Sequence, residues 1–552
     1  MQERITEKNR LKEKVAQLFM LGYEGETPGP VLDKFLSAGL GGIIFFRDNF
    51  QSMTQASQAQ ALLSGFQKQR KAGAPELFLS LDQEGGQVER LPHAIFPSLV
   101  TPRAIGLSKD PQALAETTYT VMAEHLAALG FNLNYAPTLD VNLEAKNPII
   151  GVRAFADDAK TVWRLAKIAK DDFWDTGIIP LGKHFPGHGN GTVDSHLKLP
   201  HLQFSEEELS AFQAAIDDNI PAMLVSHGFY PALQKKPDEF EQPASASKTI
   251  IQEVLKKRCG FQGLILSDDM CMGAITQEKN PIEAAIASLE AGIDLLVYKQ
   301  STESEWAVYQ GILSAIEQGR LSRQRIEEAY QKVISLKQER ARQAAKAKLS
   351  VPAISQWDAD YLSGVTLPIA KSAITVLSSQ APQATALSLT PKNSYLKNSY
   401  LLVHPDRASI TNYRFDQPTS PELPELLKTD GWTNLEAIAY RVEPTGQHFG
   451  QHQEENTLLA QLPDKHFSAV IFVSFNPLIQ PIQQALYAQI KARYPETPMI
   501  LVSAGTAYDK QVFEGVMTHI ALCSYRPPSM TALAETLTHL LKDTQQLIGK
   551  SV

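Results

Sequence analysis

The chain has 552 residues, of which 43% are hydrophobic and 20% are charged, and its net charge is −8. This composition is typical of a globular protein with an ample core, and the length allows two to four domains. The acidic balance argues against a surface for nucleic acid or an anionic membrane. No apolar run approaches the ~20 residues that span a bilayer. We therefore expect no nucleic-acid partner and no membrane attachment.

The N-terminus and the cysteines favour a cytoplasmic location. Segment 1–19 is charged and helix-like, without an apolar signal core and a small-residue cleavage site. The three cysteines, Cys259, Cys271 and Cys523, form neither a disulfide framework nor a thiolate metal site. We expect a monomer in a reducing compartment.

The N-terminal part of the chain alternates short apolar runs with amphipathic helical stretches. Ser205 and Glu208 predict a capping box at one helix start, and Asn280 followed by Pro281 predicts another start. Eight such alternations predict a (β/α)8 TIM-type barrel, with an open doubly wound sheet as the alternative. The predicted strands are 16–23, 41–46, 77–82, 132–137, 178–184, 222–227, 264–268 and 293–298.

The last barrel helix, 322–343, leads into a polar stretch rich in alanine and lysine. Beyond it, buried strands are predicted at 401–404, 469–475, 499–503 and 520–524, with helical segments between them. The sequence therefore predicts a catalytic barrel over 1–343, a linker over 344–365 and a smaller C-terminal α/β sandwich domain over 366–552.

Polar side chains stand where five of the predicted barrel strands end. Because active sites of such barrels lie at the carboxyl ends of the strands, this pattern predicts a cleft there. A strand has to end in something polar, so one instance alone carries little weight, whereas five together favour function. The residues are Asp82, Lys183, His184, Ser226, His227, Asp268, Asp269, Tyr298 and Lys299.

The segment KHFPGHGNGTVDSH (183–196) holds the highest density of candidate catalytic side chains in the sequence. Its three glycines predict a pliable loop that closes over a ligand. Asp194 and His196 share one face of an extended stretch, and a carboxylate beside an imidazole makes a general acid/base. Alternatively, His196 only satisfies a structural hydrogen bond. The histidine spacing matches no metal site, so we expect no metal.

Two adjacent carboxylates, Asp268 and Asp269, follow the seventh predicted strand in LILSDDM. Their side chains point in opposite directions, so one faces the cleft at most. A carboxylate there can attack a sugar carbon and form a covalent intermediate. The alternative is that both aspartates cap the following helix.

Asp82, Arg90 and Arg153 are candidates for gripping a polyhydroxylated ligand. Carboxylates and guanidinium groups together offer several acceptors and donors to sugar hydroxyls. As isolated charges, they would instead form surface ion pairs.

These motifs closely resemble the glycoside hydrolase family 3 β-N-acetylglucosaminidases, in the NagZ-like branch with two domains. The resemblance rests on KHFPGHG followed by DSH, and covers the whole barrel in order. It is supported by LDQEGG-x-V-x-RL (81–91), NYAPTLDVN (134–142), NP-x-IG-x-R-x-F (147–155) and LILSDDM (264–270).

The resemblance implies a retaining mechanism, with Asp268 as the nucleophile and an Asp194–His196 acid/base dyad. It also implies that the terminal N-acetylglucosamine is bound by Asp82, Arg90, Arg153, Lys183 and His184. The expected enzyme releases N-acetylglucosamine from the non-reducing end of muropeptides or chito-oligosaccharides and requires no cofactor. Three alternatives stay open: a phosphorylase with the same residues, a β-glucosidase of the same family, and a sugar-binding protein without activity.

Overall fold

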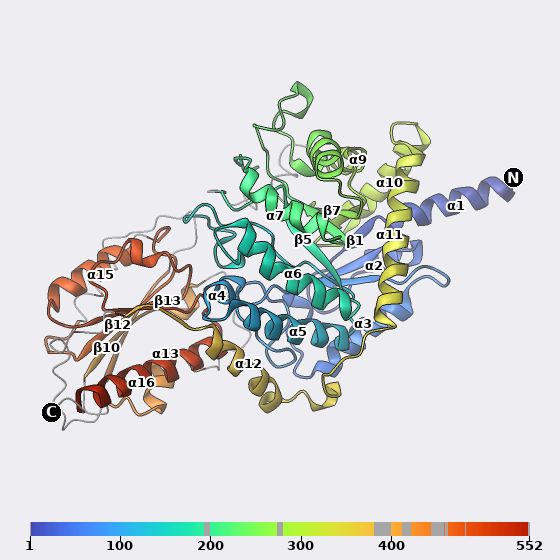
Figure 1. The fold of residues 1–552 in the computed structure, drawn as a ribbon. Coiled ribbons are helices and arrows are strands. Elements are labelled where there is room, and N and C mark those ends of the chain that lie inside the picture. Colours follow the sequence, from blue (N-terminus) through green and yellow to red (C-terminus); the bar gives the residue numbers. More distant parts are fainter. Residues whose placement is uncertain are drawn as a thin grey trace. The chain divides into compact units, whose positions relative to one another are not determined.

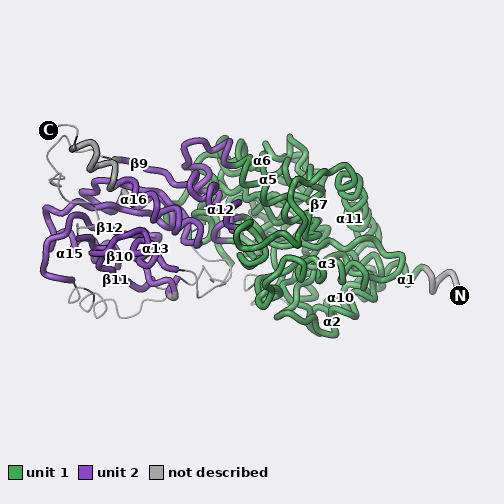
Figure 2. Tube along the Cα trace, turned by 90° about the horizontal axis from the view of Figure 1, so that it is seen from below, with its two compact units in different colours: residues 1–84, 88–97, 115–362 green, residues 85–87, 98–114, 363–552 purple. Residues whose placement is uncertain are grey.

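The computed structural model describes residues 2–191, 199–272, 280–379, 399–410, 421–442, 458, 462–480 and 482–549. The chain forms two compact units (Figure 2). The first comprises residues 1–84, 88–97 and 115–362, and the second comprises 85–87, 98–114 and 363–552. The units are thus not contiguous in sequence, which the predicted boundaries at 343 and 366 do not allow for.

The first unit contains a closed barrel of eight strands, each parallel to its neighbours, in which β1 pairs with β8. The TIM-type barrel predicted from the sequence is confirmed, and each predicted strand overlaps an observed one. The strands are short and buried because each is an apolar run enclosed by helices. They are β1 (Phe19–Leu21), β2 (Gly42–Phe45), β3 (Phe78–Leu81), β4 (Leu133–Asn134), β5 (Ile179–Phe185), β6 (Ala222–Val225), β7 (Leu264–Asp269) and β8 (Leu295–Tyr298).

Helices follow the strands and surround the barrel (Figure 1). The predicted start at Asn280 is confirmed, because its side chain accepts from the Ile282 N–H and Pro281 occupies the first turn. The helices around the barrel are α1 (Gln2–Ala16), α2 (Pro30–Ala38), α3 (Ala56–Gln69), α5 (Pro111–Leu129), α6 (Ala159–Asp175), α7 (Glu206–Asp217), η5 (Thr249–Arg258), α9 (Pro281–Ala291), α10 (Glu303–Glu317) and α11 (Arg323–Ala344). Helix α12 (Ala359–Ala373) follows them in the chain.

The second unit is built on a six-stranded sheet in the order β11-β10-β12-β13-β14-β9. All neighbouring strands are parallel except β9, which runs antiparallel to β14. The four predicted strands are all present, and the α/β character of this part is confirmed. The strands are β9 (Thr375–Ser379), β10 (Tyr400–Pro405), β11 (Leu435–Tyr440), β12 (Ala469–Ser474), β13 (Met499–Ser503) and β14 (Thr518–Ala521).

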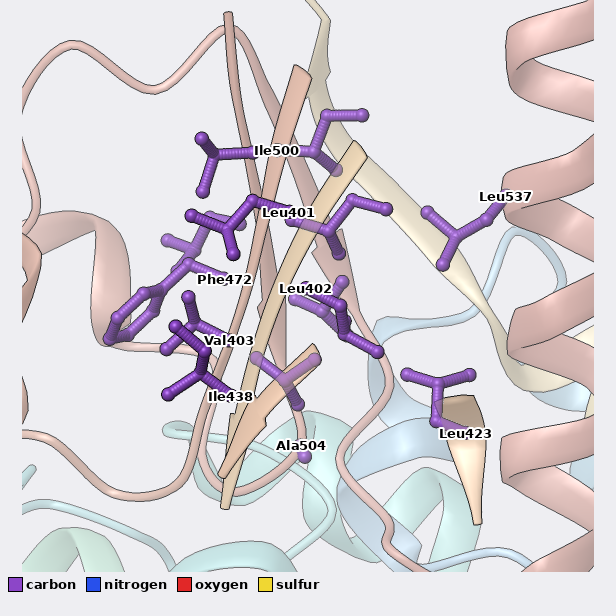
Figure 3. Packing of buried hydrophobic residues seen from close by; sticks show 14 of the residues in the cluster. Leu401, Leu402, Val403, Leu423, Ile438, Phe472, Ile500, Ala504 and Leu537 are labelled. Atoms are coloured by element: carbon purple, nitrogen blue, oxygen red, sulfur yellow. The ribbon is translucent and has the colours of Figure 1, made fainter. Parts of the chain in front are cut away.

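Side chains alternate across this sheet and fill a core on each face. Figure 3 shows Leu401 and Val403 on one side of β10, and Leu402 on the other side with Leu423 and Leu537. Leu423 belongs to α13 (Leu423–Thr429) and Leu537 to α16 (Pro527–Gly549); α15 (Ile482–Arg493) is a further helix described in this unit. All five side chains are buried. The period of two is what a strand with helices on both faces requires.

Among the residues that the structure describes, no helix has the length and apolar character needed to cross a bilayer.

Candidate active site

Asp82 lies directly after β3, and two cationic side chains donate to its carboxylate. Lys183 Nζ donates to its Oδ1 at 2.8 Å, and Arg90 donates to its Oδ2 at 3.0 Å. Lys183 comes from β5, so the contact joins two strands of the barrel at their carboxyl ends. The ion pairs hold the carboxylate at the mouth of the barrel, which is where the sequence pattern predicted a cleft.

Glu84 forms a second, more deeply buried ion pair beside the first. Arg153 donates from Nε and from a terminal nitrogen to the two carboxylate oxygens, each at 2.8 Å. Lys183 Nζ also lies 2.6 Å from Glu84. This bidentate geometry fixes the guanidinium plane of Arg153. The structure thus brings together Asp82, Arg90, Arg153 and Lys183, four residues predicted to bind sugar.

His184, the fifth predicted binding residue, is oriented by Asp140. Its Nδ1 donates to Asp140 Oδ2 at 2.6 Å, and its Nε2 lies 3.2 Å from a terminal nitrogen of Arg153. Because a carboxylate only accepts and a guanidinium only donates, the ring proton is on Nδ1 and Nε2 is the acceptor. Asp140 also accepts from the backbone N–H of His188 at 2.8 Å.

The cations keep these buried carboxylates ionised. Burial alone raises the pKa of Asp82, but Lys183 and Arg90 outweigh it and hold the pKa well below its usual range. Burial likewise opposes ionisation of Glu84, yet Arg153 and Lys183 lower its pKa from 4.5 to about 2. The pKa of Asp140 is lowered against burial by His184.

These lowered pKa values predict acid sensitivity. A carboxyl whose pKa is lower in the folded chain than in the unfolded chain contributes stability that is complete above its ordinary pKa. That contribution is lost as the pH falls through the folded value. For Glu84 the window runs from pH 4.5 down to about 2.

We therefore expect the midpoint of thermal unfolding, measured by circular dichroism at stepped pH, to fall steadily over this window. Glu84→Gln serves as the control, because it should fall less steeply. A midpoint that stays constant between these pH values would contradict the assignment.

Asp268 and Asp269 end β7 and have different surroundings. Asp269 Oδ1 accepts from the backbone N–H groups of Cys271 at 3.0 Å and Lys299 at 3.1 Å. Its side chain therefore fastens the chain after β7 to the chain after β8. Asp268 is half-buried, and its Oδ1 accepts from the Asp269 N–H at 2.8 Å. The prediction that only one of the pair faces the cleft stays a prediction.

Tyr135, after β4, lies close enough to Asp82 and Asp268 for the charges of both carboxylates to affect it. Burial raises its pKa well above 10.0, and the charges of Asp82 and Asp268 raise it further. Lys183 Nζ lies 6.0 Å from the centre of its ring. The charges of Asp82, which is predicted to bind sugar, and of Asp268, the predicted nucleophile, therefore both affect this one aromatic side chain.

His227, after β6, holds the main chain beside Asp268. Its Nδ1 lies 2.7 Å from Ser245 Oγ and its Nε2 lies 3.1 Å from the Asp269 carbonyl oxygen. Because a carbonyl only accepts, Nε2 carries the proton and Ser245 donates to Nδ1. Burial lowers the pKa of His227, which favours this neutral form.

The described part of the glycine loop, 187–191, is anchored from α7. Glu208 Oε1 accepts from the Gly189 N–H at 2.6 Å, and Oε2 accepts from the Asn190 side chain at 3.1 Å. Ser205 caps the helix through the Glu208 N–H. The reciprocal half of the predicted capping box is not formed, because the carboxylate points to the loop. A Cβ on Gly189 would lie 1.6 Å from the Val141 carbonyl oxygen, so this glycine serves close packing.

Asp194 and His196 lie outside the described residues, and their proposed pairing stays a prediction. Among the residues that are described, no group of three or more His, Cys, Asp or Glu side chains is suited to a metal ion.

Sequence reasoning missed Glu84, Asp140, Glu208 and His227 as functional supports. His227 stood at a predicted strand end, but no role was assigned to it. Glu84 and Asp140 lie inside the motifs LDQEGG and NYAPTLDVN. Asp140 also follows an isolated bridge between Thr138 and Lys183, beyond the predicted end of the fourth strand. A search two to four residues beyond each apolar run would have found both carboxylates.

Comparison with known proteins agrees with this geometry. The glycosyl hydrolase family 3 N-terminal domain matches residues 10–336. The chain belongs to this family. The resemblance seen in the sequence is confirmed, and so is the prediction that the protein is a glycoside hydrolase.

The chain is about 30% identical to several named relatives and to a solved structure. Beta-hexosaminidase A of Pseudoalteromonas piscicida is 32% identical over 284 residues, which span 49% of this chain and 47% of that protein. The beta-hexosaminidase of Chromobacterium violaceum is 33% identical over 48% of this chain and 74% of its own length. The structure of a family 3 beta-N-acetylglucosaminidase from Paenibacillus sp. str. FPU-7 superposes with a TM-score of 0.80 at 30% identity, covering 96% of each chain.

Proposed function

We propose that the protein is a retaining, exo-acting β-N-acetylglucosaminidase that removes terminal N-acetylglucosamine from muropeptides or chito-oligosaccharides. The observation that carries the proposal is the Asp82 carboxylate, held between Lys183 and Arg90 at the carboxyl ends of the barrel strands, where Asp268 also lies at the end of β7. A carboxylate flanked by cations offers acceptors and donors to adjacent sugar hydroxyls. The beta-hexosaminidase names of the relatives point to the same substrate class. A cytoplasmic, monomeric enzyme is part of the proposal.

Two displacements at the anomeric carbon give hydrolysis with retention. In the first, an Asp268 oxygen bonds to C1 from the α-face while His196 gives its proton to the departing glycosidic oxygen. In the second, water attacks C1 from the β-face, His196 takes the proton from water, and the bond to Asp268 breaks. Asp194 orients the imidazole and stabilises its cationic form. The roles of Asp194 and His196 rest on the sequence motif.

Replacing the usual second carboxylate by an imidazole has a physical consequence. An aspartate or glutamate acid/base would repel an incoming anion, whereas a neutral histidine beside the glycosyl-enzyme would not. Phosphate is therefore a second possible acceptor, which makes phosphorolysis the alternative to hydrolysis.

The wild-type protein tests the proposal directly. We expect turnover of an aryl N-acetyl-β-glucosaminide, little turnover of the matching β-glucoside, and a product that is the β-anomer when first observed by NMR. Added phosphate distinguishes the alternative, because a phosphorylase would yield N-acetylglucosamine 1-phosphate. Initial release of the α-anomer would contradict a retaining mechanism.

A further inference from the structure

Part of the loop after β3 belongs to the second unit. Residues 85–87 and 98–114 lie in this unit together with 363–552 (Figure 2). Within the unit, both polar groups of Gly86 are bonded. Its N–H donates to the Leu99 carbonyl at 2.8 Å, and its carbonyl accepts from Arg526 Nε at 2.8 Å. Arg526 is 1% exposed, so this charge-assisted bond is shielded from water.

The surroundings of Gly86 leave no room for a side chain. Its φ is +60°, and a Cβ there would lie 2.1 Å from Thr101 Cγ2. Thr101 precedes α4 (Pro102–Leu107), where its hydroxyl accepts from the Ala104 N–H and donates to the Cys523 carbonyl at 3.0 Å. The segment 523–526 therefore contacts both the turn and the start of α4, and fixes their relative position inside this unit.

The two ends of the same turn lead to the sugar-binding residues. The Glu84 N–H donates to the Val88 carbonyl at 2.9 Å, which closes the turn around Gly86. Asp82 stands two residues before Glu84, and Arg90 stands two residues after Val88. The bonds from Arg153 and Lys183 to Glu84, at 2.8 Å and 2.6 Å, depend on where the main chain of Glu84 is held.

We propose that Arg526 is a positioning residue for sugar binding. It acts by holding the Gly86 carbonyl, which fixes turn 84–88 and, through the chain, the carboxylates of Glu84 and Asp82. This assigns a function to the C-terminal part of the chain that no motif in it indicates. The proposal rests on the proposed function of the Asp82 cluster as the N-acetylglucosamine-binding site.

The test is a kinetic comparison of full-length variants on an aryl N-acetyl-β-glucosaminide. Binding residues contact the sugar before and during the reaction, so misplacing them removes uniform binding. For Arg526→Ala we expect KM to rise about tenfold while kcat changes less than about threefold. Arg526→Lys keeps a donor and should recover part of the loss. Gly86→Ala disturbs the same turn by another route and should also raise KM.

Tyr440→Phe is the matched control for loss of stability in the second unit. The Tyr440 hydroxyl is buried and lies 2.7 Å from the Val473 carbonyl oxygen and 2.8 Å from Gln483 Oε1, so its loss removes hydrogen bonds in this unit without altering a residue of turn 84–88. We expect a lower thermal midpoint and an unchanged KM. An unchanged KM in folded Arg526→Ala and Gly86→Ala, or an equal rise of KM in Tyr440→Phe, would overturn the proposal.

Calorimetry with N-acetylglucosamine separates this proposal from the proposed function. If the wild type binds the sugar but does not turn over the substrate, the enzymatic assignment is overturned while the positioning proposal stays testable. The ratio of dissociation constants for wild type and Arg526→Ala then tests positioning, again with about a tenfold weakening expected. If the wild type shows no binding and no turnover, both the proposed function and the positioning role of Arg526 are overturned.

Discussion

Replacement of Asp268 by asparagine is expected to lower kcat/KM for an aryl N-acetyl-β-glucosaminide on the order of 10³-fold or more. The amide has nearly the same shape, and its oxygen can still accept from the Asp269 N–H. It lacks the negative charge needed to attack C1, so the first displacement fails while the fold is preserved. Steady-state kinetics and a thermal scan of the same preparation measure both effects.

Asp269→Asn is the matched control for this experiment. Its amide oxygen can accept from the N–H groups of Cys271 and Lys299 as the carboxylate does. We expect a loss below about tenfold, because the side chain supports the loop and does not react. Equal losses in the two variants would mean that Asp268 is not the nucleophile.

Azide sharpens the assignment by stereochemistry. In Asp268→Ala, azide can occupy the space of the missing carboxylate and attack C1 from the α-face as an activated aryloxide leaves. The expected product is therefore the α-glycosyl azide, identified by NMR. Formation of the β-azide would place the missing carboxylate on the other face of the sugar.

Glu84→Gln is expected to destabilise the barrel by about 3–5 kcal/mol and to raise KM. The change removes one negative charge from a buried group in which Arg153 and Lys183 both face Glu84. Glu84 is 2% exposed, so water cannot replace the lost partner. Arg153 is then left with an amide oxygen in place of a bidentate carboxylate. Urea denaturation followed through the barrel transition measures the loss.

A surface carboxylate between two lysines provides the control. Asp218 accepts from Lys167 at 2.7 Å and from Lys170 at 2.5 Å, and its side chain is 33% exposed. Asp218→Asn should therefore cost less than about 1 kcal/mol, since solvent screens the charges. Comparable losses in the free energy of unfolding of the two variants would show that burial does not strengthen the ion pairs of Glu84.

The barrel was predictable because its strands are short apolar runs followed by polar residues. Strand β5 carries Lys183 and His184 at its end, and their position relative to the preceding apolar residues indicates the end of the barrel where the candidate site lies. Two strands of the second sheet were missed for the opposite reason. In β11 buried and exposed positions alternate, and β9 leaves Val376 44% exposed, so neither reads as a continuous buried run.

The supports of the candidate site were harder to predict because they form across distant parts of the chain. Glu84 meets Arg153 over 69 positions, and Asp140 meets His184 over 44. No local pattern shows which buried carboxylate a cation will find. Glu208 is a further example: its spacing from Ser205 predicts a local cap, yet its carboxylate binds the glycine loop. Tertiary pairing outweighed the local motif there.

The interleaving of the two units limits how this protein can be recombined. A cut after residue 362 releases only the last of the three segments that form the second unit, and leaves 85–87 and 98–114 behind. A chimaera that takes residues 363–552 from a relative would present foreign side chains to Gly86 and Thr101 of the original host. Such exchanges should succeed only when 85–87 and 98–114 are transplanted together with 363–552, because these three segments form one compact unit.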